Sequence, residues 1–283
     1  MERVIFLSIR LPRVLAALTA GAGLSLSGVL LQTVMANPLA GPNIIGVNAG
    51  AGFAVILMLS LFPQNVHALP VAAFVGAFCT ALAILRVARR IGAGRNTVVL
   101  AGVGCTALFQ AGISFLSTLD AEVLASYNAF SVGGFSGVSL AQLTVPGLIV
   151  LACLHVALCF SGHIAALSLG DAVASSLGVR ANRMRVLCLL LASACAAAVV
   201  SYAGLLGFAG LIMPHIARRL NGANVRSQLC TAPLAGAVIV ILSDLVGRSF
   251  FAPSEVSAGV IMAFIGAPCF FALLLRGRRN PDA

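Results

Sequence analysis

The residues from Val14 to Met35 form a stretch without a single charged side chain. As an α-helix, about twenty apolar residues cross a hydrocarbon core of about 30 Å. The stretch follows Arg13, and it ends before the turn-forming word Asn37-Pro38-Leu39-Ala40-Gly41-Pro42. It therefore predicts a membrane-spanning helix. Its small residues predict a face that lets other helices approach closely, formed by Gly21, Ala22, Gly23, Ser25, Ser27 and Gly28.

Eight further apolar windows follow, so the sequence predicts nine spans. Apolar residues make up 60% of the chain and charged residues 8%, and the mean hydropathy is +1.09. These values are typical of a polytopic membrane protein. We expect one all-α membrane domain over residues 1–283, with 118–141 as an outer loop. The windows are residues 14–35, 44–62, 68–86, 97–117, 142–162, 186–203, 205–220, 229–247 and 257–275.

All seventeen basic residues are arginines, and they lie between the apolar windows. This spacing favours a role in membrane orientation over nucleic-acid binding. One orientation places thirteen arginines in the cytoplasm and four outside, and the positive-inside rule selects it. It also places the C-terminus in the cytoplasm. The thirteen are Arg86, Arg89, Arg90, Arg95, Arg180, Arg183, Arg185, Arg218, Arg219, Arg226, Arg276, Arg278 and Arg279.

The sequence contains no motif for covalent chemistry. HExxH and GxSxG are absent, and the phosphate-binding word GxxxxGK[ST] needs a lysine that the chain lacks. The eight cysteines form no CxxC pair, which predicts neither a disulfide framework nor a metal site. His215 has no second ligand at a suitable spacing, so we interpret it as a structural histidine that is hydrogen-bonded near the cytoplasmic face. We expect no catalytic residue, metal or cofactor on this chain.

Several sequence motifs resemble those of the permease subunits of type II ABC importers. These importers move ferric siderophores, haem and cobalamin. The motifs include "RLPRVLAAL", "GAGLSLSGVLLQ" and "NPLAGPNIIGVNAGAG" near the start, and a later word similar to "GxxGFxGLxxPHxxR". The resemblance covers Arg10 to Arg279. It implies the type II importer permease fold and the import of a ferric siderophore or related iron chelate, with haem or cobalamin as alternatives.

The resemblance also implies partners. A second permease subunit, identical or different, would pair with this chain in the bacterial cytoplasmic membrane. Two ATP-binding subunits would hold ATP and Mg, and a periplasmic or lipid-anchored protein would deliver the substrate. The family usually has ten helices, and the helix before "RLPR" has no counterpart here. We expect either a start site that is assigned too late or a natural nine-span variant.

By resemblance, arginines at three motif positions dock carboxylates of the substrate-binding protein, namely Arg10, Arg13 and Arg248. Charge pairing of this kind sets orientation and association rate. The residues also permit other roles. Arg248 could pair with Asp244 one turn earlier, while Arg10 and Arg13 could reach toward lipid headgroups. Glu255 could face the binding protein or cap the last span.

The word after the first span resembles the family's cytoplasmic gate, to which it would contribute Asn37, Pro38 and Leu39. Gly94 and Arg95 match a second gate segment more weakly. Two prolines within five residues forbid a continuous helix, so a plain helix-to-helix turn is the alternative.

The stretch 167–179 resembles the family's "LGxxxAxxLG" segment, whose short helices couple to the ATP-binding subunit. Ser168 or Asp171 would cap such a helix and Gly178 would end it. An amphipathic connector is the alternative. The coupling residues would be Leu169, Gly170, Asp171, Ala174, Leu177 and Gly178.

The motif similar to "GxxGFxGLxxPHxxR" lies in the seventh apolar window and predicts a short or irregular helix there. Its motif residues are Gly207, Gly210, Pro214 and His215. Non-helical backbone at membrane depth survives only where protein or a water-lined cavity covers it. A secondary transporter could also use such a break, with Asp244, His215 or Gln32 carrying the coupling ion. The absence of a mid-span carboxylate cluster and of an evident repeat counts against that alternative.

Overall fold

The computed structural model describes the whole chain except residues 1, 44–45, 92–94, 223, 252 and 278–283. The described residues form helices and no strand, which confirms the predicted all-α class. In chain order the elements are α1 Glu2–Ile5, η1 Phe6–Arg10, α2 Leu11–Met35, α3 Val47–Leu61, η2 Val66–Ala68, α4 Leu69–Ile91, α5 Arg95–Leu119, α6 Ala121–Val132, α7 Leu140–Cys159, α8 Ser161–Ser168, α9 Asp171–Ser176, α10 Ala181–Ala203, α11 Ala209–Asn221, α12 Val225–Ser249 and α13 Ala258–Gly277.

Each predicted window coincides with a helix, but the helices differ in length. Among the described residues, six stretches are long and apolar enough to cross a membrane, and α3 and the apolar part of α13 are shorter. The prediction of a loop over 118–141 was wrong in part, because α6 lies within it. The six are Phe6–Met35, Val66–Val87, Thr97–Leu119, Leu140–Cys159, Ala181–Ala203 and Val225–Ser249.

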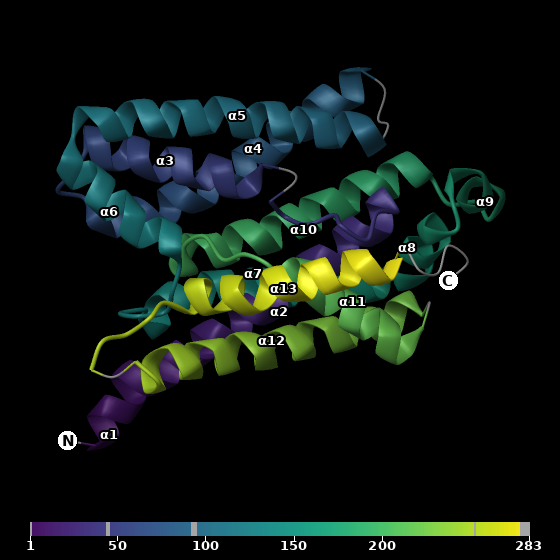
Figure 1. Cartoon of the computed structure of the whole chain (residues 1–283). Coiled ribbons are helices and arrows are strands. Elements are labelled where there is room, and N and C mark those ends of the chain that lie inside the picture. Colours follow the sequence, from purple (N-terminus) through teal and green to yellow (C-terminus); the bar gives the residue numbers. More distant parts are fainter. Residues whose placement is uncertain (1, 44–45, 92–94, 223, 252, 278–283) are drawn as a thin grey trace.

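Helix α2 lies at the centre of the bundle, packed against α10, α11 and α12 (Figure 1). Its small residues permit this, because a Cβ on Gly21 would collide with the backbone of Gly236 and one on Gly28 with the backbone of Gly210. Two of its buried polar side chains are bonded to neighbouring helices: Ser27 Oγ donates to the Ala192 carbonyl at 2.8 Å, and Gln32 Nε2 donates to the Leu211 carbonyl at 3.1 Å. The expected small-residue face is confirmed.

A second group of helices lies beside this centre. Helix α3 packs on α4, α5 and α6, and α4 also packs on α10, which joins the two groups. The bundle has two distinct ends. The N-terminus and α6 lie at one, which we call the α6 end, while α8, α9 and the last turns of α13 lie at the other, the α9 end (Figure 1).

Candidate functional site

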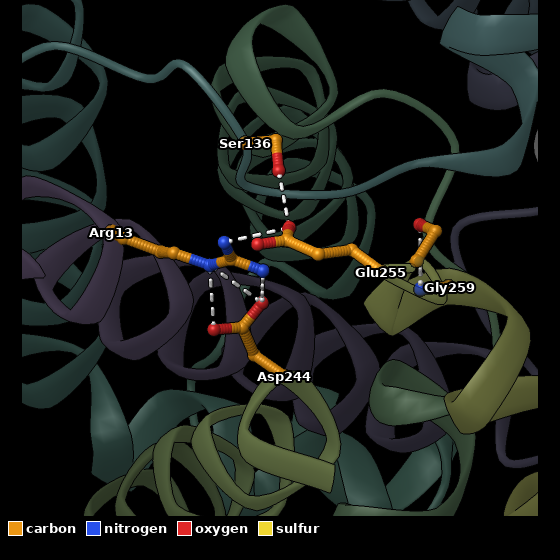
Figure 2. Close-up of polar contacts among 6 residues, drawn as sticks. Arg13, Ser136, Asp244, Glu255 and Gly259 are labelled. Atoms are coloured by element: carbon orange, nitrogen blue, oxygen red, sulfur yellow. Dashed lines mark hydrogen bonds and ion pairs between the residues drawn. The ribbon is translucent and has the colours of Figure 1, made fainter. Parts of the chain in front are cut away.

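An ionic cluster around Arg13 joins four segments at the α6 end (Figure 2). Arg13 Nε donates to both carboxylate oxygens of Asp244 in α12, at 2.9 and 3.1 Å, and Nη2 donates to Oδ1 at 2.9 Å. Nη1 donates to Glu255 Oε2 at 2.9 Å, in the loop before α13. Ser136 Oγ, between α6 and α7, donates to the same oxygen at 2.9 Å. The side chains of Arg13 and Asp244 are 15% and 7% exposed, and that of Glu255 is 49% exposed.

This cluster corrects two expectations. Asp244 pairs with Arg13 and not with Arg248, whose Nε is buried without a hydrogen-bond partner among the described residues. Glu255 does not cap the last helix, because the Ser257 hydroxyl accepts from the Gly259 N–H there. The guanidinium of Arg13, helped by the Ser136 hydroxyl, lowers the pKa of Glu255.

The three proposed docking arginines lie at the α6 end but differ in surroundings. Arg10 is exposed at the end of η1, Arg13 is held by two carboxylates, and Arg248 lies in the last turn of α12. A cavity of about 390 Å³ opens beside the cluster. Arg13, Ser136, Tyr202, Asp244 and Glu255 contribute to its lining. The docking role itself stays a prediction.

The candidate gate forms a compact turn at the α9 end. Ala36 adopts a left-handed conformation that ends α2, and the Asn37 Oδ1 accepts from the Leu39 N–H at 2.9 Å. His215 Nε2 lies 2.9 Å from the Pro38 carbonyl oxygen, and the nitrogen must donate because a carbonyl only accepts. The histidine is therefore hydrogen-bonded to the turn, and its structural role stays a prediction. Gly94 lies outside the described residues, as does the side chain of Arg95.

The broken seventh window has the irregular backbone that the sequence predicts. Gly204 and Phe208 have φ angles of +69° and +63°, and α11 begins only at Ala209. A Cβ on Gly210 would meet the Leu24 carbonyl of α2, so the break is covered by protein. Pro214 lies buried inside α11. Gly207 has open space around it.

The predicted coupling segment forms the short helix α9. Gly170 and Gly178, with φ angles of +103° and +77°, stand before and after it, a backbone conformation that favours glycine. Gly178 ends the helix as expected. The expectation of a side-chain cap was wrong, because the N-cap is Gly170 and the Asp171 carboxylate binds Arg185 instead. Ala174 is fully buried, while Leu169 and Leu177 are more than 60% exposed.

A cavity of about 550 Å³ brings the gate and the coupling segment together at the α9 end. Asn37 and Pro38 line it from the gate, Ser168 and Leu169 from the end of α8, and Arg218 from α11. The gate and coupling segments are more than a hundred residues apart in the sequence, so sequence reasoning did not bring them together. Among the described residues, no three metal-ligating side chains are grouped closely enough to hold a metal ion.

Known proteins are similar to this chain in sequence and in the arrangement of their helices. The chain is 36% identical to the Fe(3+)-citrate import system permease protein YfmE of Bacillus subtilis over 94% of its own length and 80% of that protein. It is 32% identical to the hemin transport system permease protein HmuU of Yersinia pestis over 97% and 83%. An inward-facing metal-chelate type ABC transporter superposes with a TM-score of 0.89 at 34% identity, covering 97% of this chain and 89% of that one. The model of the FecCD transport family matches residues 1–276, so the chain belongs to this family of multi-pass transport permeases.

Proposed function

We propose that this chain is the membrane-spanning permease subunit of an ATP-driven importer for a ferric siderophore or related iron chelate. The observation that carries the proposal is the family match over residues 1–276. Ferric citrate and haemin, the cargoes named for two relatives, are both iron chelates, and haem is therefore the first alternative cargo. Cobalamin stands behind it, as a cargo implied by resemblance alone.

The exposed face of α5 supports a paired permease with a path between the two copies. Gln110 lies near the middle of α5, is exposed, and has no hydrogen-bond partner among the described residues. Ser114 lies one turn further and is also exposed. Polar side chains in a span are expensive against lipid and usually face protein or a water-filled path. We infer that a second permease subunit, identical or different, covers this face and that Gln110 faces the path.

The two ends of the bundle suit two kinds of partner. Exposed Leu169 and Leu177 at the α9 end offer apolar side chains to an ATP-binding subunit, which would hold ATP and Mg. Arg10 and Arg248 at the α6 end suit the carboxylates of a substrate-binding protein. We therefore propose that the α9 end and the C-terminus lie in the cytoplasm, and the arginine distribution supports this orientation. We also propose that the chain is a single permease domain of the bacterial cytoplasmic membrane.

The ion-coupled alternative is not favoured by the contacts of its candidate residues. Asp244 pairs with Arg13, His215 binds the Pro38 carbonyl, and the Gln32 amide donates to the Leu211 carbonyl. Each contact fixes a packed helix or turn. A coupling ion would have to displace these partners.

Reconstitution in lipid vesicles tests the proposal. The permease is combined with its ATP-binding subunit and its substrate-binding protein, and uptake of a radiolabelled ferric siderophore, of haem and of cobalamin is measured. We expect accumulation of the iron chelate only when ATP is hydrolysed. Uptake that follows a proton or sodium gradient and ignores ATP would overturn the proposal, and uptake of haem or cobalamin alone would overturn the siderophore cargo.

A further inference from the structure

We propose that Arg185 is a positioning residue that fixes α9 to α10 and passes movements of α9 into the membrane helices. This inference rests on the proposed function, because it assumes that the ATP-binding subunit acts on α9. It concerns a residue outside the family's coupling word, which ends at Gly178.

Helix α9 depends on contacts with neighbouring helices for its position. It has six residues, and isolated helices of this length are not stable in water. It packs on α8 and α10, and its buried side chain is that of Ala174. Within and beside α9, three apolar side chains are exposed, namely Leu169, Val173 and Leu177, which we call the α9 patch. A partner pulling on this patch would act through the few contacts that tie α9 to the bundle.

The strongest of these contacts is ionic. Arg185 Nη2 donates to both carboxylate oxygens of Asp171, each at 2.8 Å, and Nη1 donates to Asn182 Oδ1 at 3.2 Å. The Arg185 side chain is 6% exposed, whereas that of Asp171 is 54% exposed. Charge-assisted hydrogen bonds of this kind are short and about twice as strong as neutral ones. The buried arginine is therefore a fixed point on α10, and the aspartate attaches α9 to it.

Helix α10 continues the connection toward the gate. It packs along α2, α4 and α7, and its Ala192 carbonyl accepts from Ser27 of α2. Helix α2 ends at Met35, directly before the gate word. A displacement of α9 would thus reach Asn37 and Pro38 through two packed helices.

The experiment uses the complete importer in vesicles and compares Arg185→Gln and Asp171→Asn with the wild type. Arg183→Gln, an exposed arginine in the same turn of α10, is the matched control. Three quantities are measured for each: recovery of the ATP-binding subunit with the permease, the ATP hydrolysis rate, and cargo imported per ATP.

We expect import per ATP to fall about ten-fold in both variants, the size that positions on a coupling route give. Arg185→Gln, which lies outside the coupling segment, should also assemble and hydrolyse ATP within about two-fold of the wild type. The double variant should fall no further than the worse single variant, because both substitutions break the same ion pair. Arg185→Lys should restore only part of the loss, since an ammonium lacks the planar fork. Arg183→Gln should match the wild type.

Wild-type import per ATP in an assembled Asp171→Asn complex would overturn the inference, because this variant keeps the size of a half-exposed side chain and removes its charge. Loss of ATP-binding-subunit recovery in both variants would also overturn it, since the pair would then shape the docking surface only. If the wild-type permease itself fails to bind an ATP-binding subunit, the proposed function fails instead.

Discussion

Helices α2 and α5 look alike in the sequence and differ in the structure. Their apolar stretches have mean hydropathies of 1.9 and 1.8, yet 72% of the α2 window is buried inside the chain and only 17% of the α5 window. Hydropathy reports that a segment prefers lipid or protein to water, and it does not distinguish the two. The difference lies in which neighbours each helix has.

The two helices differ in what their small and polar residues contact. Gly28 of α2 lies against the backbone of Gly210, while a Cβ on Gly104 of α5 would meet nothing within 4 Å. Gln32 of α2 donates to a carbonyl of α11, while Gln110 of α5 is exposed without a partner in the described part of the chain. Of these two helices, the central one has glycines packed against the backbones of neighbouring helices. The exposed one, α5, presents a face that another molecule can cover.

Alanine substitutions of the two glycines should give the largest contrast. Gly28→Ala forces α2 away from α11, and we expect a loss of about 3 kcal/mol in the free energy of unfolding, as overpacking against backbone gives. Gly104→Ala should lose nothing and can gain from helix propensity. Thermal unfolding in detergent, followed by size-exclusion chromatography, measures both. Equal midpoints for the two variants would contradict the assignment of α2 to the centre.

The ion pair between Arg13 and Asp244, which we call the outer anchor of α2, should be the next most sensitive site. Asp244→Asn removes the negative charge of the buried side chain that binds Arg13. We expect a loss of about 2 kcal/mol in the free energy of unfolding, typical of hydrogen bonds between charged groups. Glu255→Gln should cost less than about 1 kcal/mol, because that carboxylate is half exposed and solvent screens the pair. The same unfolding measurement applies. A greater loss for Glu255→Gln would show that the loop contact, and not the contact between α2 and α12, holds this end together.

Local patterns predicted much of this molecule, because they depend on residues close together in the chain. Apolar windows located the helices, the glycines and serines of 21–28 predicted close packing, and Gly204 to Pro214 predicted a broken helix. The N-cap of α6 was also readable: Asp120 Oδ1 accepts from the N–H groups of Glu122 and Val123. An aspartate that begins an apolar segment is a helix-start signal, and it was overlooked.

Long-range pairings were not predictable from spacing. Asp244 stands four residues before Arg248, which favours a pair within the helix, yet its partner Arg13 is 231 residues away. The partly buried Arg13 guanidinium needs a carboxylate partner, and only the packing of α2 on α12 shows which one lies within reach. The pair between Asp171 and Arg185 was missed for a related reason: a cap at the start of a helix explained the aspartate equally well.

The two glutamines test the same comparison through function. Gln32→Leu removes a buried hydrogen bond, and we expect a loss of about 1 kcal/mol in stability. Gln110→Leu removes no hydrogen bond to any described residue, so stability should be unchanged, but import of the iron chelate should fall a few-fold if this side chain faces the path. Unfolding and vesicle uptake are measured for both. Normal uptake by Gln110→Leu would remove the argument that α5 lines the path.

The smallest effect concerns pH at the α6 end. Arg13 and Ser136 lower the pKa of Glu255 below 4.5 in the folded chain, so its carboxylate stabilises the fold above its unfolded pKa. That contribution is lost as the pH falls through the folded pKa. The difference in unfolding midpoint between wild type and Glu255→Gln should therefore be constant near neutral pH and shrink below about pH 4.5. Glu122→Gln, which removes an exposed carboxylate at the same end, controls for a general loss of surface charge. A difference that persists unchanged at pH 3 would mean that the Gln substitution acts through loop packing, and that the anchor of α2 depends on Asp244 alone.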